Sequence, residues 1–549
     1  MITVTDVSVG FSEKPLFKDV NLKFTPGNCY GIIGANGAGK STFLKVLSGD
    51  LEHDSGTISV STGERLAVLK QDHFAYDEYS VKDTVMMGFP KLYDLNRERE
   101  AIYAKEDFSE EDGIRASEIE GEFSEIGGWE AENQIEQMLS GLGLEEEFHD
   151  KMMSDLDESQ KVRVLLAQSI FGNPDILLLD EPTNGLDIES ISWLENFLLE
   201  FENTVIVVSH DRHFLNTVCT YICDIDFGKI TQYAGNYDFW FQMSQIMQKQ
   251  AKDQQKKAED KMKDLKEFIL RFSSNAAKSK QATSRKKVFD KLAQEVEDIP
   301  VTTRKFPYVN FKADREIGNN VLEIKKISYE EDGASLLKNF SLTVNRKDKI
   351  AFVGIEHNSI SALFDIINDV KKPSDGEFFW GQTTSHVYLP RDTGSYFEND
   401  LNITDWLKQY SKEQDDAYVR GFLGRMLFSG DESLKKVKVL SGGEKVRCML
   451  SKLMLSGANV LIMDDPTNHL DLEAIQSLNE ALISFPGVVL FTSHDHEFIQ
   501  SIANRIVEIT PNGIIDRMTS FDNYITDDTV TELRTELYTG TGKKIKYRV

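Results

Sequence analysis

The stretch that decides the fold is "GANGAGKSTFL", from Gly34 to Leu44. It fits the pattern G-x-x-x-x-G-K-[ST], with an apolar run, "CYGII", before it and a helical pattern, "STFLKVLSG", after it. A strand, a glycine-rich loop and a helix in this order form a phosphate-binding loop, because the glycines let backbone N–H groups turn toward the phosphates and Lys40 neutralises their charge. The sequence therefore predicts that the chain binds a nucleotide.

The second half of the chain repeats the first. "GIEHNSISALF" begins at Gly354, 320 positions after Gly34, and has Ile360 in the place of the lysine. "VLIMDDPTNHLD" from Val460 and "FTSHDHEF" from Phe491 each lie 284 positions after their first-half counterparts, "ILLLDEPTNGLD" and "VVSHDRHF". A repeat of this length predicts two copies of one domain. Because the offset falls by 36, the first copy carries that many extra residues between its phosphate loop and "LLLDEP".

The extra residues fall between Lys91 and Glu130. This segment holds 13 acidic and 5 basic residues, and its apolar residues have helical spacing. We interpret it as an inserted acidic, helical arm. Such an arm either contacts a partner or is an enlarged surface subdomain without one.

The linker between the copies also has a helical pattern. A long run of helix formers without glycine or proline is broken by "SSNAAKSKQATSRKK" and then resumes, which predicts two helices joined by a polar tip. From Arg271 to Lys291 there are seven basic residues and one acidic residue. Basic side chains among small polar ones suit the phosphate backbone of a nucleic acid, although a basic tip can also be a solvated helical hairpin.

Length and composition limit the remaining possibilities. The chain has 549 residues, too many for one hydrophobic core, and its net charge of −28 disfavours indiscriminate nucleic-acid binding. The four cysteines lack metal-ligand spacing and read as reduced thiols. Neither a signal segment nor a membrane span is evident. We expect a soluble, cytoplasmic protein, for which any membrane role would need a separate subunit.

Two carboxylates follow an apolar run in the first half. "DILLLDEP" has the composition of a buried parallel strand, which would deliver Asp180 and Glu181 to its carboxyl edge beside the phosphate loop. Asp180 and the Ser41 hydroxyl suit Mg²⁺, and Glu181 is a candidate base for the attacking water. His210 would face the terminal phosphate. A lone histidine there is more often structural, but this one recurs as His494.

With these elements in order, the chain resembles the ATP-binding cassette superfamily, and "LSGGEK", from Leu440 to Lys445, is similar to its signature loop. Tandem cassettes, an acidic insertion in the first, a basic helical hairpin between them and no membrane segment together resemble the ABC-F subfamily, and "NAAKSKQATSRKK" looks like its interdomain tip. The likeness covers essentially the whole chain.

The resemblance implies an α/β fold of two tandem ATP-binding cassettes, with a helical insertion in the first and a helical hairpin linker between them. The expected boundaries are 1–240 for the first cassette, with the arm at about 88–130; 241–305 for the hairpin, with its basic tip at about 271–291; 306–525 for the second cassette; and 526–549 for a short C-terminal tail.

The resemblance also implies how ATP is held. In this subfamily each ATP lies between the phosphate loop of one cassette and the signature loop of the other, so the two cassettes close head to tail and we expect a monomer. Phe11 is a candidate for stacking on adenine, although an aromatic residue there is as often part of the core. The intact site is expected to use Glu181 and His210 in catalysis, Ser41, Gln71 and Asp180 for Mg²⁺, and for ATP binding Phe11, Gly34, Asn36, Gly37, Gly39, Lys40, Ser41, Thr42, Gln71, Asp180, Ser441, Gly442, Gly443 and Glu444.

The other composite site has lost these features. Gly37, Gly39, Lys40, Gln71 and Glu181 correspond to His357, Ser359, Ile360, Arg391 and Asp465, and the first copy's signature position reads "LDESQ". The degenerate site is therefore expected to contain Ile360, Ser361, Arg391, Asp464, Asp465, His494, Asp157 and Glu158. Losing one charge-assisted contact to a transferring phosphate commonly costs several kcal/mol, so this site should not turn over. Slow hydrolysis, or a bound nucleotide that serves only to fill the interface, remains open for it.

We therefore expect an ATPase that uses ATP and Mg²⁺ at one of two composite sites. The resemblance implies that the ATP-closed form binds the ribosome and places the hairpin near peptidyl-tRNA and the peptidyl-transferase centre of the large-subunit RNA to modulate translation, and that hydrolysis releases it. The acidic arm would meet basic ribosomal proteins or the tRNA elbow region, and its charge favours protein over RNA. The residues expected to contact ribosomal RNA or tRNA are Lys278, Lys280, Arg285, Lys286 and Lys287. Two alternatives are a tandem ATPase that energises a transporter through a separate membrane subunit, and a non-hydrolysing relative that uses ATP as a clamp.

Overall fold

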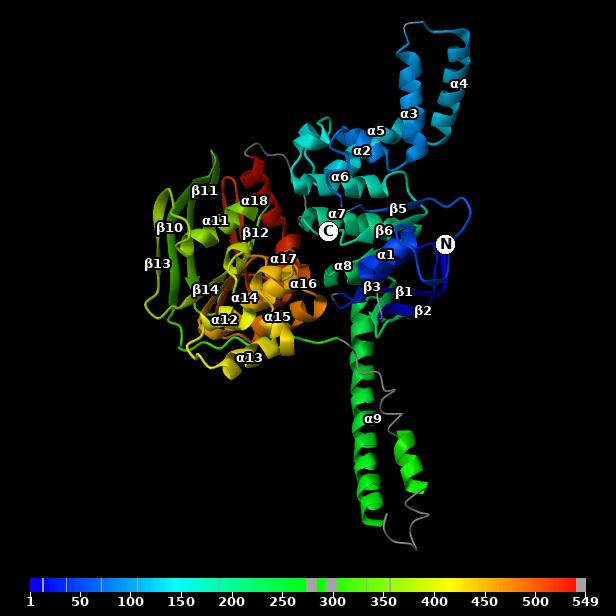
Figure 1. The fold of residues 1–549 in the computed structure, drawn as a ribbon. Coiled ribbons are helices and arrows are strands. Elements are labelled where there is room, and N and C mark those ends of the chain that lie inside the picture. Colours follow the sequence, from blue (N-terminus) through cyan, green and yellow to red (C-terminus); the bar gives the residue numbers. More distant parts are fainter. Residues whose placement is uncertain are drawn as a thin grey trace.

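The computed structural model describes the chain except for residues 12–13, 36, 71, 106, 187, 273–283, 293–303, 332, 355–356 and 540–549. It consists of two α/β cassettes, each with a three-stranded antiparallel sheet and a six-stranded mixed sheet (Figure 1). The strand orders are β2-β1-β4 and β5-β6-β7-β3-β8-β9 in the first cassette, and β11-β10-β13 and β14-β15-β16-β12-β17-β18 in the second. The two halves therefore have the same topology, as the sequence repeat predicts.

The first cassette follows the strand and helix patterns of its sequence. Its strands are β1 (Ile2–Phe11), β2 (Lys14–Phe24), β3 (Asn28–Gly34), β4 (Ser55–Val60), β5 (Leu66–Val68), β6 (Ile176–Asp180), β7 (Thr204–Val208), β8 (Tyr221–Asp226) and β9 (Lys229–Ala234). Its body helices are α1 (Lys40–Ser48), α2 (Val81–Met86), α5 (Ala131–Gly141), α6 (Glu158–Ile170), α7 (Ile188–Glu200) and α8 (Arg212–Val218).

The parallel order of the central sheet brings three loops to one edge. Strands β6, β7 and β3 are neighbours and run parallel, and β7 is buried along its whole length, as a Val- and Ile-rich run requires. The loop after β3 carries the predicted phosphate-binding motif, β6 ends at Asp180 with Glu181 directly after it, and His210 lies in the loop after β7. These functional groups therefore converge at the carboxyl ends of the strands.

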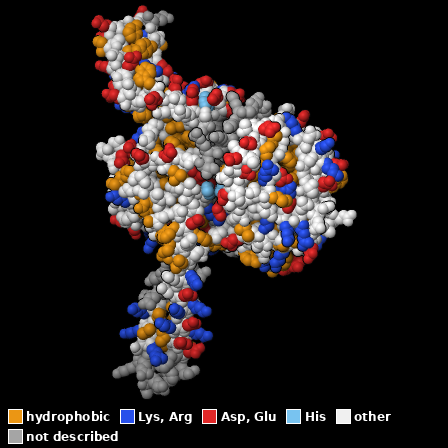
Figure 2. Space-filling view, turned by 180° about the vertical axis from the view of Figure 1, so that it is seen from behind, with side chains coloured by type: hydrophobic (Ala, Val, Ile, Leu, Met, Phe, Trp, Pro, Cys, Tyr) orange, Lys and Arg blue, Asp and Glu red, His pale blue; other side chains and the backbone are white. Residues whose placement is uncertain are grey.

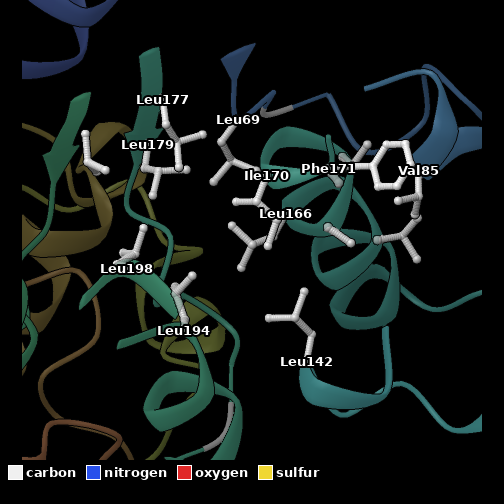
Figure 3. Close-up of a cluster of buried hydrophobic side chains, with 14 of the residues drawn as sticks. Leu69, Val85, Leu142, Leu166, Ile170, Phe171, Leu177, Leu179, Leu194 and Leu198 are labelled. Atoms are coloured by element: carbon white, nitrogen blue, oxygen red, sulfur yellow. The ribbon is translucent and has the colours of Figure 1, made fainter. Parts of the chain in front are cut away.

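The helical part of the first cassette packs on one face of this sheet. Figure 3 shows Leu177 and Leu179 of β6 facing Leu166 and Ile170 of α6, with Leu194 of α7 nearby. These side chains are almost completely buried. The packing fixes the positions of α6 and α7 relative to β6.

The second cassette repeats this plan. Its strands are β10 (Asn320–Glu331), β11 (Ala334–Asn345), β12 (Lys349–Val353), β13 (Asp375–Trp380), β14 (His386–Leu389), β15 (Val460–Met463), β16 (Val488–Phe491), β17 (Arg505–Thr510) and β18 (Gly513–Arg517). Its helices are α11 (His357–Ile367), α12 (Ile403–Lys408), α13 (Asp416–Arg425), α14 (Gly442–Ser456), α15 (Leu472–Ser484), α16 (His496–Ile502), α17 (Phe521–Thr526) and α18 (Asp528–Thr539). Single 3-10 turns in the two cassettes are Gly128–Glu130, Glu146–Phe148, Met153–Asp155, Gly394–Phe397, Gly430–Leu434 and Val437–Val439.

Two helical projections leave the first cassette in opposite directions (Figure 1). One is the pair α3 (Pro90–Tyr103) and α4 (Glu110–Glu125), which pack on each other. The other begins with α9 (Tyr237–Phe272), which starts four residues before the boundary expected from the sequence, and a second helical segment lies at 284–292. None of the described helices is both long enough and apolar enough to cross a membrane.

The segment that the sequence analysis places in a C-terminal tail contains a packed helix. Arg534 of α18 is 2% exposed, and its Nε donates hydrogen bonds to both oxygens of Glu508 on β17, at 2.9 and 2.7 Å. Tyr524 of α17 donates to the same carboxylate at 2.6 Å, and Val530 lies in the core of the second cassette. Residues 528–539 therefore belong to the second cassette rather than to a peripheral tail.

Candidate functional site

The first phosphate loop has the backbone that its glycines predict. Gly37 and Gly39 have φ angles of 79° and 101°, a region that favours glycine, and a Cβ atom at Gly37 would meet nothing within 4 Å. Helix α1 begins at Lys40, whose side chain is buried and donates from Nζ to the Gly34 carbonyl at 2.9 Å. Ser41 and Thr42 follow in the first turn. The loop thus presents a glycine backbone and a buried cation at the N-terminus of a helix.

Glu181, the carboxylate predicted to act in catalysis, lies beside this loop in a buried position. Glu181 follows β6 with φ 52°, and its N–H donates to the Val208 carbonyl at 2.8 Å, which ties the loop to β7. Burial raises the pKa of Glu181 to about 8, while the N–H of His210 and the charge of Lys40 act in the opposite direction. A carboxyl group with a pKa close to neutrality is suited to accept a proton.

His210 is paired with this carboxyl group. Its backbone N–H donates to Glu181 Oε2 at 3.1 Å, and its Nε2 lies 3.3 Å from Glu181 Oε1. Burial, with the nearby charge of Lys40, lowers the pKa of His210 to about 3, so the imidazole is neutral at physiological pH. These two contacts fix the orientation of the carboxyl group and of the imidazole ring relative to each other.

These residues fit ATP and Mg²⁺. The open space at Gly37, the buried Lys40 and the first turn of α1 suit an anion, because a helix N-terminus and a cation both attract phosphate. Asp180 ends β6 at the same sheet edge, and a carboxylate with the Ser41 hydroxyl is a donor set that Mg²⁺ accepts.

The second cassette has no such loop in its described part, because helix replaces it. Helix α11 begins at His357, the counterpart of Gly37, whereas α1 begins three positions later in the alignment, at Lys40. Ser359 and Ile360 are 3% and 1% exposed, and Ile360 packs in the core between the two sheets. The residues that would surround phosphates therefore form an additional helical turn.

Asp464 is the second-cassette counterpart of Asp180, the residue predicted to bind Mg²⁺. Its carboxylate already accepts hydrogen bonds from protein side chains. Asp464 accepts hydrogen bonds from His357 Nε2 at 2.9 Å, Ser361 Oγ at 2.6 Å and Thr492 Oγ1 at 3.0 Å. Burial alone would raise the pKa of Asp464, but these bonds outweigh it, with His357 first, and hold the pKa below its usual value. The sequence indicated the Gly-to-His change but not this bond.

The other degenerate positions lie around this carboxylate. Asp465 is buried, and its N–H donates to Thr492 Oγ1 at 2.8 Å, while the His494 ring lies 5.5 Å from the His357 ring. Arg391 lines a cavity of about 180 Å³ together with Asp464 and Asp465. The structure therefore brings the predicted second-cassette residues together, and from His357 onward the segment beside them is a helix rather than a phosphate loop.

The two signature positions are structural counterparts of each other. Ser441 caps α14, and Asp157 caps α6, each through a reciprocal pair of hydrogen bonds with the residue three positions later. Gly442 follows Ser441 at the exposed start of α14, and Glu158 follows Asp157 at the exposed start of α6. The same capping arrangement at both helices therefore supports the alignment of "LDESQ" with the signature loop. The exposed start of α14 presents glycines, whereas that of α6 presents a carboxylate.

Two carboxylates of the second cassette affect the pKa of Lys40 in the first phosphate loop. Burial lowers the pKa of Lys40, and the carboxylates of Glu181, Glu473 and Asp471 act in the opposite direction. Asp471 and Glu473 lie at the start of α15, in the second cassette. The pairing of Lys40 with Ser441 stays a prediction, whereas the approach of α15 was not foreseen in the sequence.

Comparison with known proteins places the chain in a family. A family model described as ABC transporter matches residues 17–184 and 337–468, and a second model with the same description matches residues 223–311. The chain is 59% identical over 540 residues to the ABC transporter ATP-binding protein YkpA of Bacillus subtilis (strain 168), covering 98% of this chain and 100% of that protein. It is 29% identical to ABC transporter F family member 2 of Arabidopsis thaliana, covering 95% of this chain and 78% of the relative. The chain belongs to the ABC-F subfamily of ATP-binding cassette proteins.

Two further comparisons bear on this ABC-F protein. It is 29% identical to the energy-dependent translational throttle protein EttA of Mycobacterium tuberculosis (strain CDC 1551 / Oshkosh), covering 92% of this chain and 90% of that protein. Among solved structures, the complex of an archaeal ribosomal stalk protein with the ribosome recycling factor aABCE1 has a TM-score of 0.59 at 16% identity, and the match covers 92% of this chain and 87% of that one. The latter likeness shows a shared tandem-cassette fold.

Some residues predicted for this ABC-F protein cannot be placed. Asn36, Gln71, Lys278 and Lys280 lie outside the described residues, and of Phe11 only its place at the end of β1 is described. Arg285, Lys286 and Lys287 are exposed in the segment 284–292. Figure 2 shows Lys and Arg side chains along the described part of the hairpin, and Asp and Glu side chains on the arm.

Proposed function

We propose that this ABC-F protein is a cytoplasmic ATPase that binds the ribosome when ATP closes its two cassettes. In this state its hairpin lies near peptidyl-tRNA and the large-subunit RNA and modulates translation. Hydrolysis of ATP at one composite site, built by the first phosphate loop and the second signature loop, releases the protein.

The observation that carries the proposal is the difference between the two phosphate loops. The first keeps glycine backbone and a buried lysine, whereas the second is helical, with Ile360 in the core and Asp464 bonded to three protein donors. Because phosphoryl transfer depends on positive charge and oriented donors, only the first loop is equipped for it.

The residues of the intact site then have separate roles. Lys40 and the N–H groups of the loop bind the phosphates, and Asp180 with Ser41 would hold Mg²⁺, which supplies charge neutralisation when bound. Glu181 accepts the proton of the attacking water, because its raised pKa lets it take up a proton near neutral pH. His210 orients Glu181 through the contact between Nε2 and Oε1.

The ribosome enters the proposal through the hairpin and the relatives. Exposed cations at Arg285, Lys286 and Lys287 suit RNA phosphates, and EttA, a relative across nine-tenths of both chains, is named as a translational throttle protein. A transporter role gives the hairpin no function.

Cosedimentation tests the proposal. With ATP, E181Q should accumulate on ribosomes because the closed form cannot hydrolyse its nucleotide, while D465N should behave like the wild type. Retention of both variants on membranes instead, or no ribosome binding by E181Q, would favour the transporter role. Wild-type protein without any turnover, even with ribosomes, would favour an ATP clamp.

The contribution of the hairpin is tested separately. Replacing Arg285, Lys286 and Lys287 with glutamine should weaken ribosome binding, and should reduce the dependence of binding on salt, because fewer counterions are released. The matched control replaces three exposed lysines of the α9 stem, Lys256, Lys257 and Lys261. An equal loss in both triple variants would show that only overall charge matters.

A further inference from the structure

The base of the hairpin is joined to both cassettes by one buried arginine. Arg304 lies where the chain returns from the hairpin to the second cassette, and its side chain is 4% exposed. Its Nη2 is paired with Asp224 of β8 in the first cassette, and its Nη1 with Glu473 of α15 in the second. One guanidinium group thus bridges two domains and the end of the linker.

The first helix of the hairpin takes part in the same contact. Trp240, near the start of α9, lies with its ring 4.6 Å from the Arg304 guanidinium carbon and donates from Nε1 to Asp224 Oδ2 at 3.2 Å. Trp240 is 3% exposed. The start of α9 and the segment that begins at Arg304 therefore meet at this arginine. We call Arg304, Trp240, Asp224 and Glu473 together the hairpin joint.

The hairpin joint is closely packed. The cavity enclosed by Trp240, Phe241, Arg304, Phe306 and Glu473, among others, measures about 10 Å³, which is no more than a single water molecule requires. The Glu473 side chain is 4% exposed and that of Asp224 is 12% exposed. Charges buried to this extent need their partners, so a displacement of Arg304 must move Glu473 or leave it without compensation.

Glu473 connects the hairpin joint to the start of α15, where the second cassette packs on the first. It lies in the first turn of α15, next to Leu472, which packs in the core cluster of the first cassette. Asp471 caps the same helix by accepting from the Ala474 N–H at 2.9 Å. Asp224, the other partner of Arg304, lies on β8 opposite Ile33 of β3, the residue before Gly34 of the first phosphate loop. The hairpin joint is thus attached to the start of α15 in the second cassette and, through Asp224, to the strand beside the one that leads into the first phosphate loop.

We propose that Arg304 is a positioning residue that couples the hairpin to the intact ATP site, by holding Glu473 at the start of α15 and Asp224 beside the strand that leads into the first phosphate loop. This inference rests on the proposed function, since it concerns how the ribosome-bound hairpin regulates that site. When the hairpin shifts on the ribosome, Trp240 and Arg304 shift with it. Glu473 and Asp224 then move with Arg304, and with them the start of α15 and the strand beside the one that leads into the first phosphate loop, which alters hydrolysis. Coupling of this kind is reciprocal for binding, so ATP in the intact site should also change the position of the hairpin.

The test compares ATP turnover with and without ribosomes. R304M removes the bridge, and R304K keeps the charge but cannot pair with Asp224 and Glu473 at once through a planar fork. Both should reduce the ribosome-dependent change in kcat by about fivefold or more, with basal kcat within about threefold of the wild type. K305M is the matched control, because Lys305 is the adjacent exposed cation.

Further readouts separate coupling from a general loss of structure. E473Q should lose the ribosome response as R304M does, and the double variant R304M/E473Q should lose no more than either one, because both act in one bridge. If R304M fails to fold, R304K and E473Q carry the test. Ribosome cosedimentation is measured for each variant in parallel, so loss of binding, which would contradict the proposed function, is distinguished from loss of response.

An unchanged ribosome response in folded R304K and E473Q would overturn the inference. So would a wild-type protein that binds ribosomes without any change in its turnover, since there would be no coupling for Arg304 to carry. Additive losses in the double variant would show that Arg304 and Glu473 act separately.

Discussion

His357 Nε2 lies 2.9 Å from Asp464 Oδ1, and the counterpart of His357 in the first cassette is Gly37, around which a Cβ atom would meet nothing within 4 Å. One substitution thus fills the space that a phosphate needs and bonds the carboxylate that a metal needs. The two cassettes of this ABC-F protein have the same fold, but the first leaves open space at this position and the second fills it with a side chain.

H357A should therefore destabilise the second cassette without affecting turnover. Loss of a hydrogen bond to a buried carboxylate lowers the free energy of unfolding by about 1.5–3 kcal/mol. Urea unfolding followed by a probe in the second cassette measures the loss of stability. Steady-state ATPase activity shows whether turnover is unchanged. A fall in turnover to the level of a Lys40 variant would show that the second site takes part in hydrolysis.

Turnover should rise with pH between 7 and 9. Burial raises the pKa of Glu181 to about 8, so the protonated form predominates at pH 7 and the carboxylate, which accepts the proton, predominates at pH 9. The expected increase in kcat/KM is about tenfold, because kcat/KM follows the ionisation of the free enzyme. A profile that is flat over this interval would mean that Glu181 is already ionised at pH 7 or is not the base.

S441D should abolish turnover while leaving the fold intact. Aspartate is as good a helix cap as serine, and Asp157 already caps the corresponding helix α6. A carboxylate facing the terminal phosphate removes a donor and adds repulsion, so we expect kcat to fall by about 100-fold or more.

The converse change, D157S, is the matched control for S441D because it alters the cap of the degenerate site. It should leave turnover within about twofold of the wild type. If D157S reduced kcat as much as S441D, the assignment of Ser441 to the intact site would be wrong.

R534M should destabilise the second cassette strongly. Arg534 and Glu508 have side chains 2% and 1% exposed, and removing one member of a buried ion pair costs about 3–5 kcal/mol because the other charge remains uncompensated. Thermal unfolding measures the loss, and R517M, at an exposed arginine, should change stability by no more than about 0.5 kcal/mol. Equal effects of the two substitutions would place Arg534 at the surface.

The sequence predicts most of the intact site because its motifs are local. The phosphate loop, Glu181 and His210 each follow an apolar strand pattern, and parallel strands bring their ends to one sheet edge. The repeat also predicts that Asp157 and Ser441 are equivalent, and both residues cap a helix. Periodicity and alignment suffice for such features.

Contacts between residues that are far apart in the sequence cannot be predicted from motifs or alignment. Alignment shows histidine in place of Gly37 but not that its ring reaches Asp464, which is 107 positions away. The bridge from Arg304 to Glu473 spans 169 positions and joins two domains. Residues 528–539 have a short, polar pattern that indicates a tail, and only the contact of Arg534 with Glu508 shows that they form part of the core.

The most direct test of the central claim is the ATP turnover of K40M, measured with and without ribosomes against H357A as the reference for the second cassette. Loss of the only cation in a phosphate loop of the described structure should reduce kcat by at least about 100-fold in both conditions, while H357A retains wild-type kcat. Turnover by K40M at a substantial fraction of the wild-type rate would contradict the account, because the second cassette would then have to hydrolyse ATP without a lysine.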